Sequence, residues 1–301
     1  MPIPKKRITY MKFYSLISVF IFIGTSLMVP KLQAQNLSKE EINELIRELP
    51  SFSIHKDNYF ITGVPTNTAI SSQTADIKYQ ISFKQLITHN TLPWETYLFL
   101  TYNQKAFWNI YEDSSPFQEI NFNPSIGLGK AIYDKNNRVK GLASLLINHN
   151  SNGRDSIYSR SWNSVNLKYT TSLNPKALLS VEAWAPFRYK DGNPDLLDYI
   201  GLAEVTFSYD FKPNKLLFEI SAKKGLQWNW NGALRSRVYY NPFKSTNQYL
   251  MLEWFAGYGE SLIDYDQFTS MVRFGYVIKS NEMDFLKSKS RSKITKVKAM
   301  F

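Results

Sequence analysis

From residue 58 onward, apolar and polar residues alternate in repeated segments with a period of two, and this alternation limits the possible folds more than any other feature. A two-residue period puts successive side chains on opposite faces of a β-strand, whereas a helix requires a period near 3.6. The run from Tyr199 to Asp210 is a clear example. Each segment is about 9–11 residues long or a little longer, which is the length that a tilted strand needs to cross a bilayer. Residues that favour turns separate them, at Asp134–Asn137, Asn174–Pro175, Asp191–Pro194, Lys212–Asn214 and Asn241–Pro242.

These segments predict an all-β fold, a twelve-stranded antiparallel transmembrane β-barrel. We expect strands near residues 58–66, 77–88, 96–108, 123–134, 139–152, 161–174, 177–189, 197–211, 215–228, 232–241, 247–260 and 267–279. An even number of strands lets the two ends of the sheet meet, and closure removes the unpaired edges that lipid cannot satisfy. A soluble β-sandwich has the same period and is the alternative fold.

The N-terminal residues have the layout of a secretory signal peptide. Basic residues at Lys5–Arg7 precede an apolar run from Phe13 to Val29, and small residues up to Ala34 offer a cleavage site. A single membrane-anchoring helix is the alternative, because the run is near the lower length limit for spanning a bilayer. Gly24 and Pro30 interrupt the run. We therefore predict a cleaved signal peptide at residues 1–34.

The rest of the chain is expected to form one domain with short extensions. Residues 35–57 form an N-terminal periplasmic segment, in which Ser38 and Glu41 have the spacing of a capping box that begins a short helix over residues 38–49. Pro50 would end this helix. The barrel occupies residues 58–285, and residues 286–301 form a basic C-terminal tail.

The net charge of +11 is located at the two ends of the chain. Residues 1–34 hold five basic and no acidic residues, and residues 287–301 hold six basic and none acidic. The body between them is neutral, so it lacks the basic surface of a nucleic-acid binder, and no nucleic-acid partner is expected. The absence of cysteine excludes disulfides and thiolate metal sites. The aromatic content of 15% suits the girdles of a membrane barrel.

His149 and Ser151 lie two residues apart at the end of an apolar stripe, so their side chains point to the same side of one strand. On the next strand, Asn163 begins a similar stripe. If residues 152–162 connect the two strands, the hairpin brings a hydroxyl, an imidazole and an amide together on an apolar wall. This arrangement predicts a hydrolase that faces lipid.

The three residue types suggest separate roles. Ser151 is the candidate nucleophile, and His149 is the general base and then the general acid. Asn163 would accept a hydrogen bond from the imidazole and fix its tautomer, as the third member of a triad does. A His and a Ser two residues apart on a strand also occur by chance. A neutral amide stabilises an imidazolium less than a carboxylate would, so another charge is needed.

Several segments carry a resemblance to a known family. Asn148–Arg154 reads Asn-His-Asn-Ser-Asn-Gly-Arg, and Ser159–Asn163 reads Ser-Arg-Ser-Trp-Asn. Together they resemble the active-site signature of the outer membrane phospholipase A family. Ser114–Glu119, Asn193–Asp195 and Gly257–Tyr265 are similar to other segments of that family, so the resemblance covers most of residues 58–285.

The resemblance implies a phospholipase A1/A2 and lysophospholipase of the Gram-negative outer membrane, which hydrolyses acyl esters of membrane glycerophospholipids. It also implies an enzyme that depends on calcium and is active as a homodimer among outer-membrane lipid. A glutamine that matches Gln104 pairs across the dimer in the family; a lumen-facing Gln104 is the alternative.

The resemblance further implies a set of residues around the oxyanion. Calcium ligands would be the Ser159 hydroxyl and the Arg154 carbonyl of one subunit, Ser114 of the partner subunit, and waters. Hard oxygen ligands of this kind suit Ca²⁺. The backbone N–H of Gly153 would donate to the oxyanion.

Two other functions fit the same strands. A pore or structural barrel without catalysis would keep the strands but would not need Ser151. A lipid A deacylase would use the same chemistry on a different acyl ester.

Overall fold

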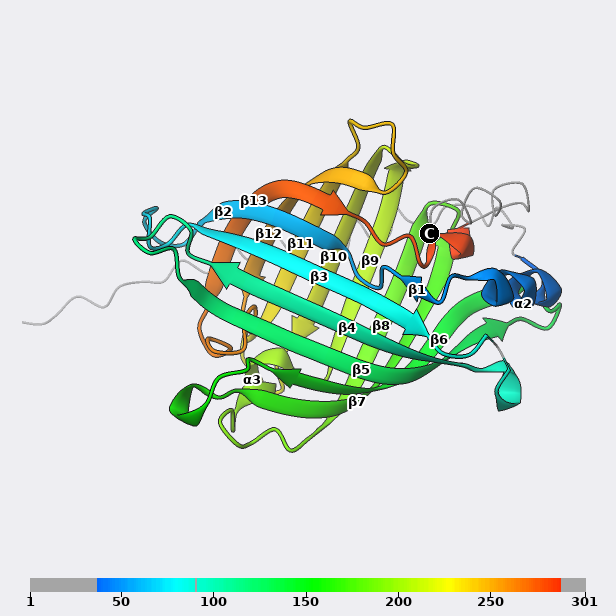
Figure 1. Cartoon of the computed structure of the whole chain (residues 1–301), viewed down its shortest axis with the longest axis horizontal. Coiled ribbons are helices and arrows are strands. Elements are labelled where there is room, and N and C mark those ends of the chain that lie inside the picture. The colour runs from blue at the N-terminus through cyan, green and yellow to red at the C-terminus, as the bar shows by residue number, and fades with distance from the viewer. Residues whose placement is uncertain (1–36, 90, 288–301) are drawn as a thin grey trace, which may run out of the picture. The chain divides into compact units, whose positions relative to one another are not determined.

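Twelve antiparallel strands, β2 to β13, form a closed barrel (Figure 1). The computed structural model describes residues 37–89 and 91–287, so the predicted signal peptide and residues 288–301 of the predicted tail lie outside the described residues. Each of these twelve strands pairs with its neighbour along the chain, and β13 pairs with β2 to close the ring, whereas the two-residue strand β1 pairs with β3. The strands are β1 (Phe52–Ser53), β2 (Asn58–Pro65), β3 (Asp76–Leu86), β4 (Tyr97–Trp108), β5 (Phe117–Tyr133), β6 (Val139–Ser151), β7 (Ser161–Asn174), β8 (Ala177–Phe187), β9 (Ala203–Lys212), β10 (Leu216–Lys224), β11 (Gly232–Tyr240), β12 (Gln248–Gly257) and β13 (Thr269–Ile278).

The predicted twelve-stranded barrel is confirmed, and two strand boundaries were wrong. The predicted strand at 197–211 begins only at Ala203, because residues before it form the short helix α3 (Leu196–Ile200). Leu196, Leu197 and Ile200 are buried there on one face of the helix. β5 begins at Phe117 rather than near residue 123, and a register shift in its pairing with β4 hides the alternation in this part.

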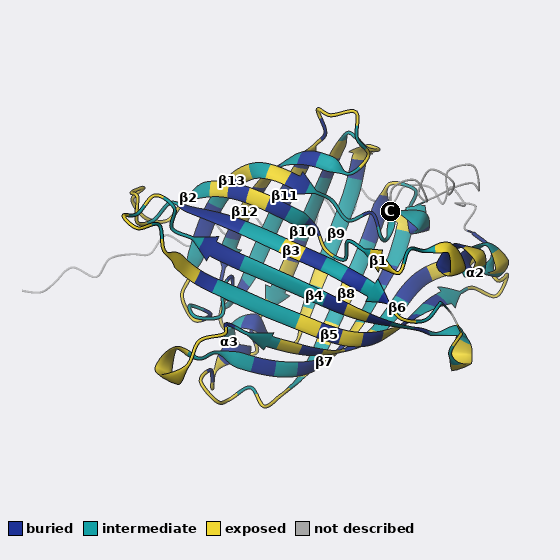
Figure 2. Cartoon of the chain, viewed as in Figure 1, coloured by how far each residue is buried: buried dark blue, intermediate teal, exposed yellow. Residues whose placement is uncertain are grey.

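The outer surface of the barrel is apolar and its interior is polar. On β6 and β7, Leu145, Ile147 and Leu167 are 49%, 55% and 57% exposed, whereas the alternate residues Ser164 and Asn166 are buried. Figure 2 shows this alternation of buried and exposed positions along the strands. A soluble sandwich would bury its apolar faces between two sheets, so the inverted pattern indicates a barrel that crosses a membrane. Among the described helices, none is both long and apolar enough to span a bilayer.

Helix α2 (Lys39–Glu48) covers one end of the barrel wall and confirms the predicted short helix. Ser38 and Glu41 form the capping box, in which each side chain accepts a hydrogen bond from the backbone N–H of the other residue. The buried face of the helix packs in one apolar cluster with residues of the strands and with Leu286 of the 3-10 turn η4 (Asp284–Lys287). Packing of this apolar face provides most of the stability of so short a helix.

A network of buried ion pairs ties distant strands together inside the barrel. Lys78 Nζ lies 2.7 Å from Glu253 Oε1 and 2.8 Å from Glu260 Oε1, and its side chain is completely buried. Arg273 Nη2 lies 2.6 Å from Asp76 Oδ2, and Arg273 Nη1 lies 2.8 Å from Glu260 Oε1. Because these charges have little access to water, each depends on its partners for compensation.

Replacement of Lys78 by methionine is expected to destabilise the barrel by about 3–5 kcal/mol, because it leaves buried carboxylates with less compensating charge. The free energy of unfolding in urea, measured in detergent micelles, checks this. Lys135→Met, at an exposed turn, is the control and should change stability little. Equal effects of the two substitutions would contradict a stabilising role for the network.

Candidate active site

Strands β6 and β7 form the hairpin that the sequence predicted. His149 lies directly opposite Asn163 in the register, and Ser151 lies opposite Ser161. The connecting loop, residues 152–160, contains one 3-10 turn, η3 (Ser156–Tyr158). The antiparallel pairing of β6 with β7 therefore brings His149 and Asn163 together, although they lie on different strands.

The imidazole of His149 contacts the amide of Asn163. His149 Nδ1 lies 2.9 Å from Asn163 Oδ1. A carbonyl oxygen only accepts, so this contact places the proton on Nδ1 and leaves Nε2 as the basic nitrogen. His149 is exposed on the outer wall, two residues beyond the exposed Ile147.

Ser151 lies on the same face of β6 as His149 and is half-buried. No hydrogen bond joins its hydroxyl to the imidazole within the residues that the structure describes. Catalytic hydrogen bonds are often long without substrate and shorten in the complex. The structure therefore brings His149 and Asn163 together and places Ser151 beside them.

Aromatic rings border the three residues on both sides. Phe122 of β5 is the register partner of Ser151, and Phe187 of β8, 42% exposed, is the partner of Asn163. Gly153 follows Ser151 with φ +65°, and a Cβ there would lie 2.9 Å from Phe122 Cε2. Both the backbone conformation and the close ring favour glycine at this position.

Asn152 organises the loop that follows, and the sequence analysis did not single it out. The residue is 4% exposed. Nδ2 donates to the Tyr158 carbonyl at 2.8 Å, and Oδ1 accepts from the backbone N–H groups of Arg160, at 3.0 Å, and Arg154, at 3.3 Å. A single buried amide thus connects both ends of the loop. Asparagine directly after a strand is a common turn residue, which is the only signal the sequence carries.

Glu119 is a second residue that the sequence analysis missed. The residue is 1% exposed, and its carboxylate Oε2 lies 3.4 Å from Arg154 Nε. Oε1 accepts from Asn121 Nδ2 at 2.7 Å and from the Ile263 N–H at 3.1 Å. Glu119 therefore connects the site loop to the loop between β12 and β13.

Glu119→Gln is expected to loosen the site loop, because glutamine can still accept from Ile263 but does not attract the guanidinium of Arg154. Because the Arg154 side chain is 38% exposed, this ion pair contributes at most about 1 kcal/mol, so trypsin cleavage after Arg154 should accelerate by about fivefold. Glu95→Gln, near the opposite end of the barrel, is the control. An unchanged cleavage rate in Glu119→Gln would show that this contact does not hold the loop.

The oxygen atoms expected to hold calcium lie on two loops. Ser159 and Arg154 both belong to the loop over residues 152–160, whereas Ser114 is exposed on the loop between β4 and β5, where its φ is +65°. The Ser159 and Ser114 hydroxyls make no hydrogen bond with any other described residue, which leaves them available as ligands. Neutral hydroxyl and carbonyl oxygens are hard donors that Ca²⁺ accepts. In residues 37–89 and 91–287, no group of three His, Cys, Asp or Glu side chains could hold a metal ion.

The rim near this loop carries Asp264, between β12 and β13. Its Oδ2 accepts from Gln118 Nε2 at 3.4 Å. Burial raises the pKa of Asp264, and the neighbouring charge of Asp266 raises it further. The position of Asp264 beside Gln118 places a carboxylate near the base of the site loop.

Gln104 lies on β4 and accepts a hydrogen bond at Oε1 from the Tyr102 hydroxyl, at 2.8 Å. It shares a face of the strand with Leu100, which is 42% exposed. The alternative of a lumen-facing Gln104 is therefore not supported.

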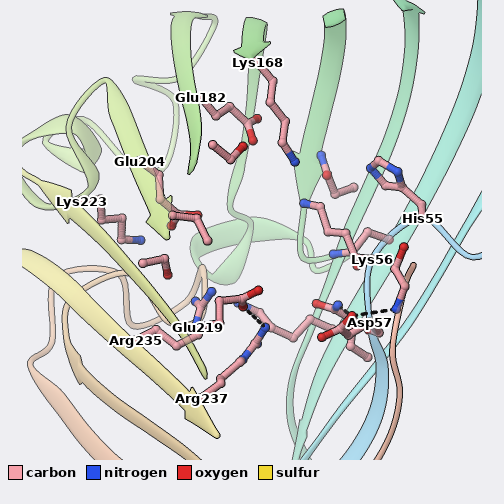
Figure 3. Close-up of a pocket in the computed structure, with 18 of the residues that line it drawn as sticks. His55, Lys56, Asp57, Lys168, Glu182, Glu204, Glu219, Lys223, Arg235 and Arg237 are labelled. Carbon is pink, nitrogen blue, oxygen red and sulfur yellow. Dashed lines mark hydrogen bonds and ion pairs between the residues drawn. The ribbon is translucent and has the colours of Figure 1, made fainter. Parts of the chain in front are cut away.

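A separate polar cavity of about 460 Å³ lies inside the barrel (Figure 3). Lys168, Glu182 and Glu204 are register neighbours on three consecutive strands that line it, and Lys56 and Lys223 also point into it. The three predicted catalytic residues are not among its lining residues. The candidate site therefore lies on the outer face of the barrel wall, whereas this cavity lies on its inner face.

The fold and the site define a membrane β-barrel whose outer, lipid-facing wall carries a histidine–amide pair beside a serine. The chain belongs to the outer membrane phospholipase A family, since the model of the family described as Phospholipase A1 matches residues 41–278. It is accordingly a protein of the outer membrane of a Gram-negative bacterium.

Individual relatives agree with this assignment. Phospholipase A1 of Escherichia coli K12 is 31% identical over 219 residues, which cover 70% of this chain and 72% of that protein. Phospholipase A1 of Klebsiella pneumoniae is 30% identical over 216 residues, with the same coverage of each chain. A solved structure described as the Salmonella typhi outer membrane phospholipase dimer with bound calcium has 25% identity and a TM-score of 0.69, and covers 81% of this chain and 99% of that one.

Proposed function

We propose that this protein hydrolyses the acyl esters of glycerophospholipids in the outer membrane, as a phospholipase A1/A2 and lysophospholipase. The observation that carries the proposal is the 2.9 Å contact between His149 and Asn163 on the lipid-facing wall, with Ser151 on the same face. Relatives named phospholipase A1 support the substrate class.

Ser151 acts as the nucleophile and His149 as the base. The Ser151 oxygen forms a bond to the ester carbonyl carbon while His149 Nε2 takes the hydroxyl proton. When the tetrahedral intermediate collapses, the bond to the glycerol oxygen breaks and the imidazolium returns the proton to it. Water then attacks the acyl-enzyme by the same route and releases a fatty acid. Asn163 keeps the imidazole in the tautomer that this sequence requires.

The oxyanion forms above the loop that follows Ser151. The N–H of Gly153 is the proposed protein donor, and its positive φ turns the backbone sharply after the nucleophile. Ser159 and the Arg154 carbonyl, with Ser114 of the partner subunit, are the proposed calcium ligands. Calcium, when bound, would add positive charge near the oxyanion. The separation of the ligands between two loops is consistent with a site shared by a homodimer.

Substrate is proposed to arrive laterally from the bilayer. Ile147 and Val165 extend the apolar wall below His149 and are 55% and 39% exposed, and acyl chains can lie along them. The rings of Phe122 and Phe187 border the reacting ester. This placement separates the proposed enzyme from a pore, whose functional surface would be the lumen.

A fatty-acid release assay tests the proposal. Phospholipid in mixed micelles is compared with lipopolysaccharide, with calcium and with chelator. Release from phospholipid alone supports a phospholipase, whereas release from lipopolysaccharide alone supports a lipid A deacylase. Ion conductance in planar bilayers without any fatty-acid release would support a pore.

A further inference from the structure

We infer that Asn123 is a positioning residue for His149, because its side chain replaces a backbone hydrogen bond that Pro124 cannot make. This inference rests on the proposed role of His149 as the base. It concerns β5, the strand that borders the site hairpin on the side away from Asn163.

Pro124 lies inside β5, opposite His149. The pairing of β5 with β6 includes Phe122 with Ser151 and Ser125 with Asn148, and the same register puts residue 124 across from residue 149. Pairs at residues 123 and 124 are absent from this ladder in the described part of the chain. Proline has no N–H, so it cannot donate to the carbonyl across from it.

This missing donor would leave the His149 carbonyl without its partner in the ladder. An unpaired backbone carbonyl is costly away from water, and in a membrane strand it is especially unfavourable. Asn123 supplies the donor: its Nδ2 lies 2.9 Å from the His149 carbonyl oxygen. The side-chain amide thus stands in for the N–H that the next residue lacks.

His149 is therefore held at two points from opposite sides. Asn163 on β7 holds the ring, and Asn123 on β5 holds the main chain. If Asn123 is lost, β6 can shift at His149 while the contact with Asn163 remains. A displacement of about 1 Å can reduce catalysis by up to a hundredfold, so a partial shift should lower kcat without changing how the substrate binds.

The experiment compares four test variants and one control variant of the full-length protein with wild type. Asn123→Ala removes the side chain, and Asn123→Asp keeps its shape but replaces the donor with an acceptor. Pro124→Ala restores a backbone N–H. The double variant Asn123→Ala/Pro124→Ala combines the loss of one donor with the gain of the other. Asn103→Ala is the matched control, because Asn103 is the register partner of Asn123 on β4 and makes no contact with His149 among the described residues.

We expect kcat to fall by about tenfold in Asn123→Ala and Asn123→Asp with KM unchanged, as the loss of about one hydrogen bond predicts. Pro124→Ala and Asn103→Ala should stay close to wild type. The double variant should recover to within about twofold of wild type, because the new N–H can reach the His149 carbonyl. A second readout is the rate at which a long-chain sulfonyl fluoride modifies Ser151, which should follow the same order.

Two outcomes would overturn the inference: full activity in Asn123→Asp, or a double variant as impaired as Asn123→Ala. If Asn123 had only a structural role, the loss of activity would match a loss in heat stability of the folded band in gel electrophoresis. Adding Pro124→Ala would then not restore the activity. Failure of the proposed function is distinguishable, because wild type itself would then release no fatty acid.

Discussion

Replacement of Ser151 by alanine is expected to reduce fatty-acid release from phospholipid by about a millionfold, the scale on which removal of a serine nucleophile acts in serine hydrolases. Without the hydroxyl, no acyl-enzyme can form, and the remaining groups can only orient water. Release of radiolabelled fatty acid from mixed micelles has the range needed to measure this loss.

Ser144→Ala is the matched control for Ser151→Ala. Ser144 lies on the same strand and lines an interior cavity instead of the outer wall. The barrel of both variants should keep the heat-dependent gel mobility of wild type, since neither serine belongs to the buried ion network. Substantial release by Ser151→Ala, or equal losses in the two variants, would remove Ser151 from the mechanism.

Removal of calcium is expected to reduce release by about a hundredfold to a thousandfold, which is the usual cost of losing one oxyanion stabiliser. Chelator should abolish most of the activity, and added Ca²⁺ should restore it. Mg²⁺ should restore little, because it holds its waters tightly and requires strict octahedral geometry.

Ser159→Ala and Ser114→Ala test the proposed ligands of that ion. Each variant should need a higher calcium concentration for half-maximal activity, and Ser114→Ala should also weaken calcium-dependent dimerisation in sedimentation experiments. Ser156→Ala, on the same loop as Ser159, is the control. Full activity of wild type in chelator would contradict a role for calcium altogether.

The hairpin of the candidate site could be predicted because its evidence is local. A stripe of apolar residues ends at His149, another begins at Asn163, and the two-residue period makes both stripes face the same way. The two-residue period gave wrong boundaries at the start of β5 and at Leu196–Ile200, where the buried residues lie on one face of a short helix. Packing against Trp162 and Tyr265, which are distant in sequence, favours the helix there.

The supporting residues could not be predicted in the same way. Glu119, Asn123 and Asn152 act through an ion pair or through backbone carbonyl and N–H groups, and these contacts depend on register and on loop conformation. A polar residue on a lumen-facing stripe has the same appearance in the sequence whether it faces water or holds the site loop. For Asn123, the signal available in the sequence was Pro124. A proline inside a strand has no N–H, so a carbonyl on the neighbouring strand needs another hydrogen-bond donor.

The order in which the barrel assembles follows from how far apart its contacts lie along the chain. His149 and Asn163 are 14 residues apart, whereas Lys78 and Glu253 are 175 apart, and Arg273 and Asp76 are 197 apart. Hairpins form in about microseconds, and contacts between distant segments form later because longer loops must close first. We therefore expect the β6–β7 hairpin to form before β2 and β13 pair during insertion. The buried ion pairs of Lys78 and Arg273 would then form last, when the barrel closes.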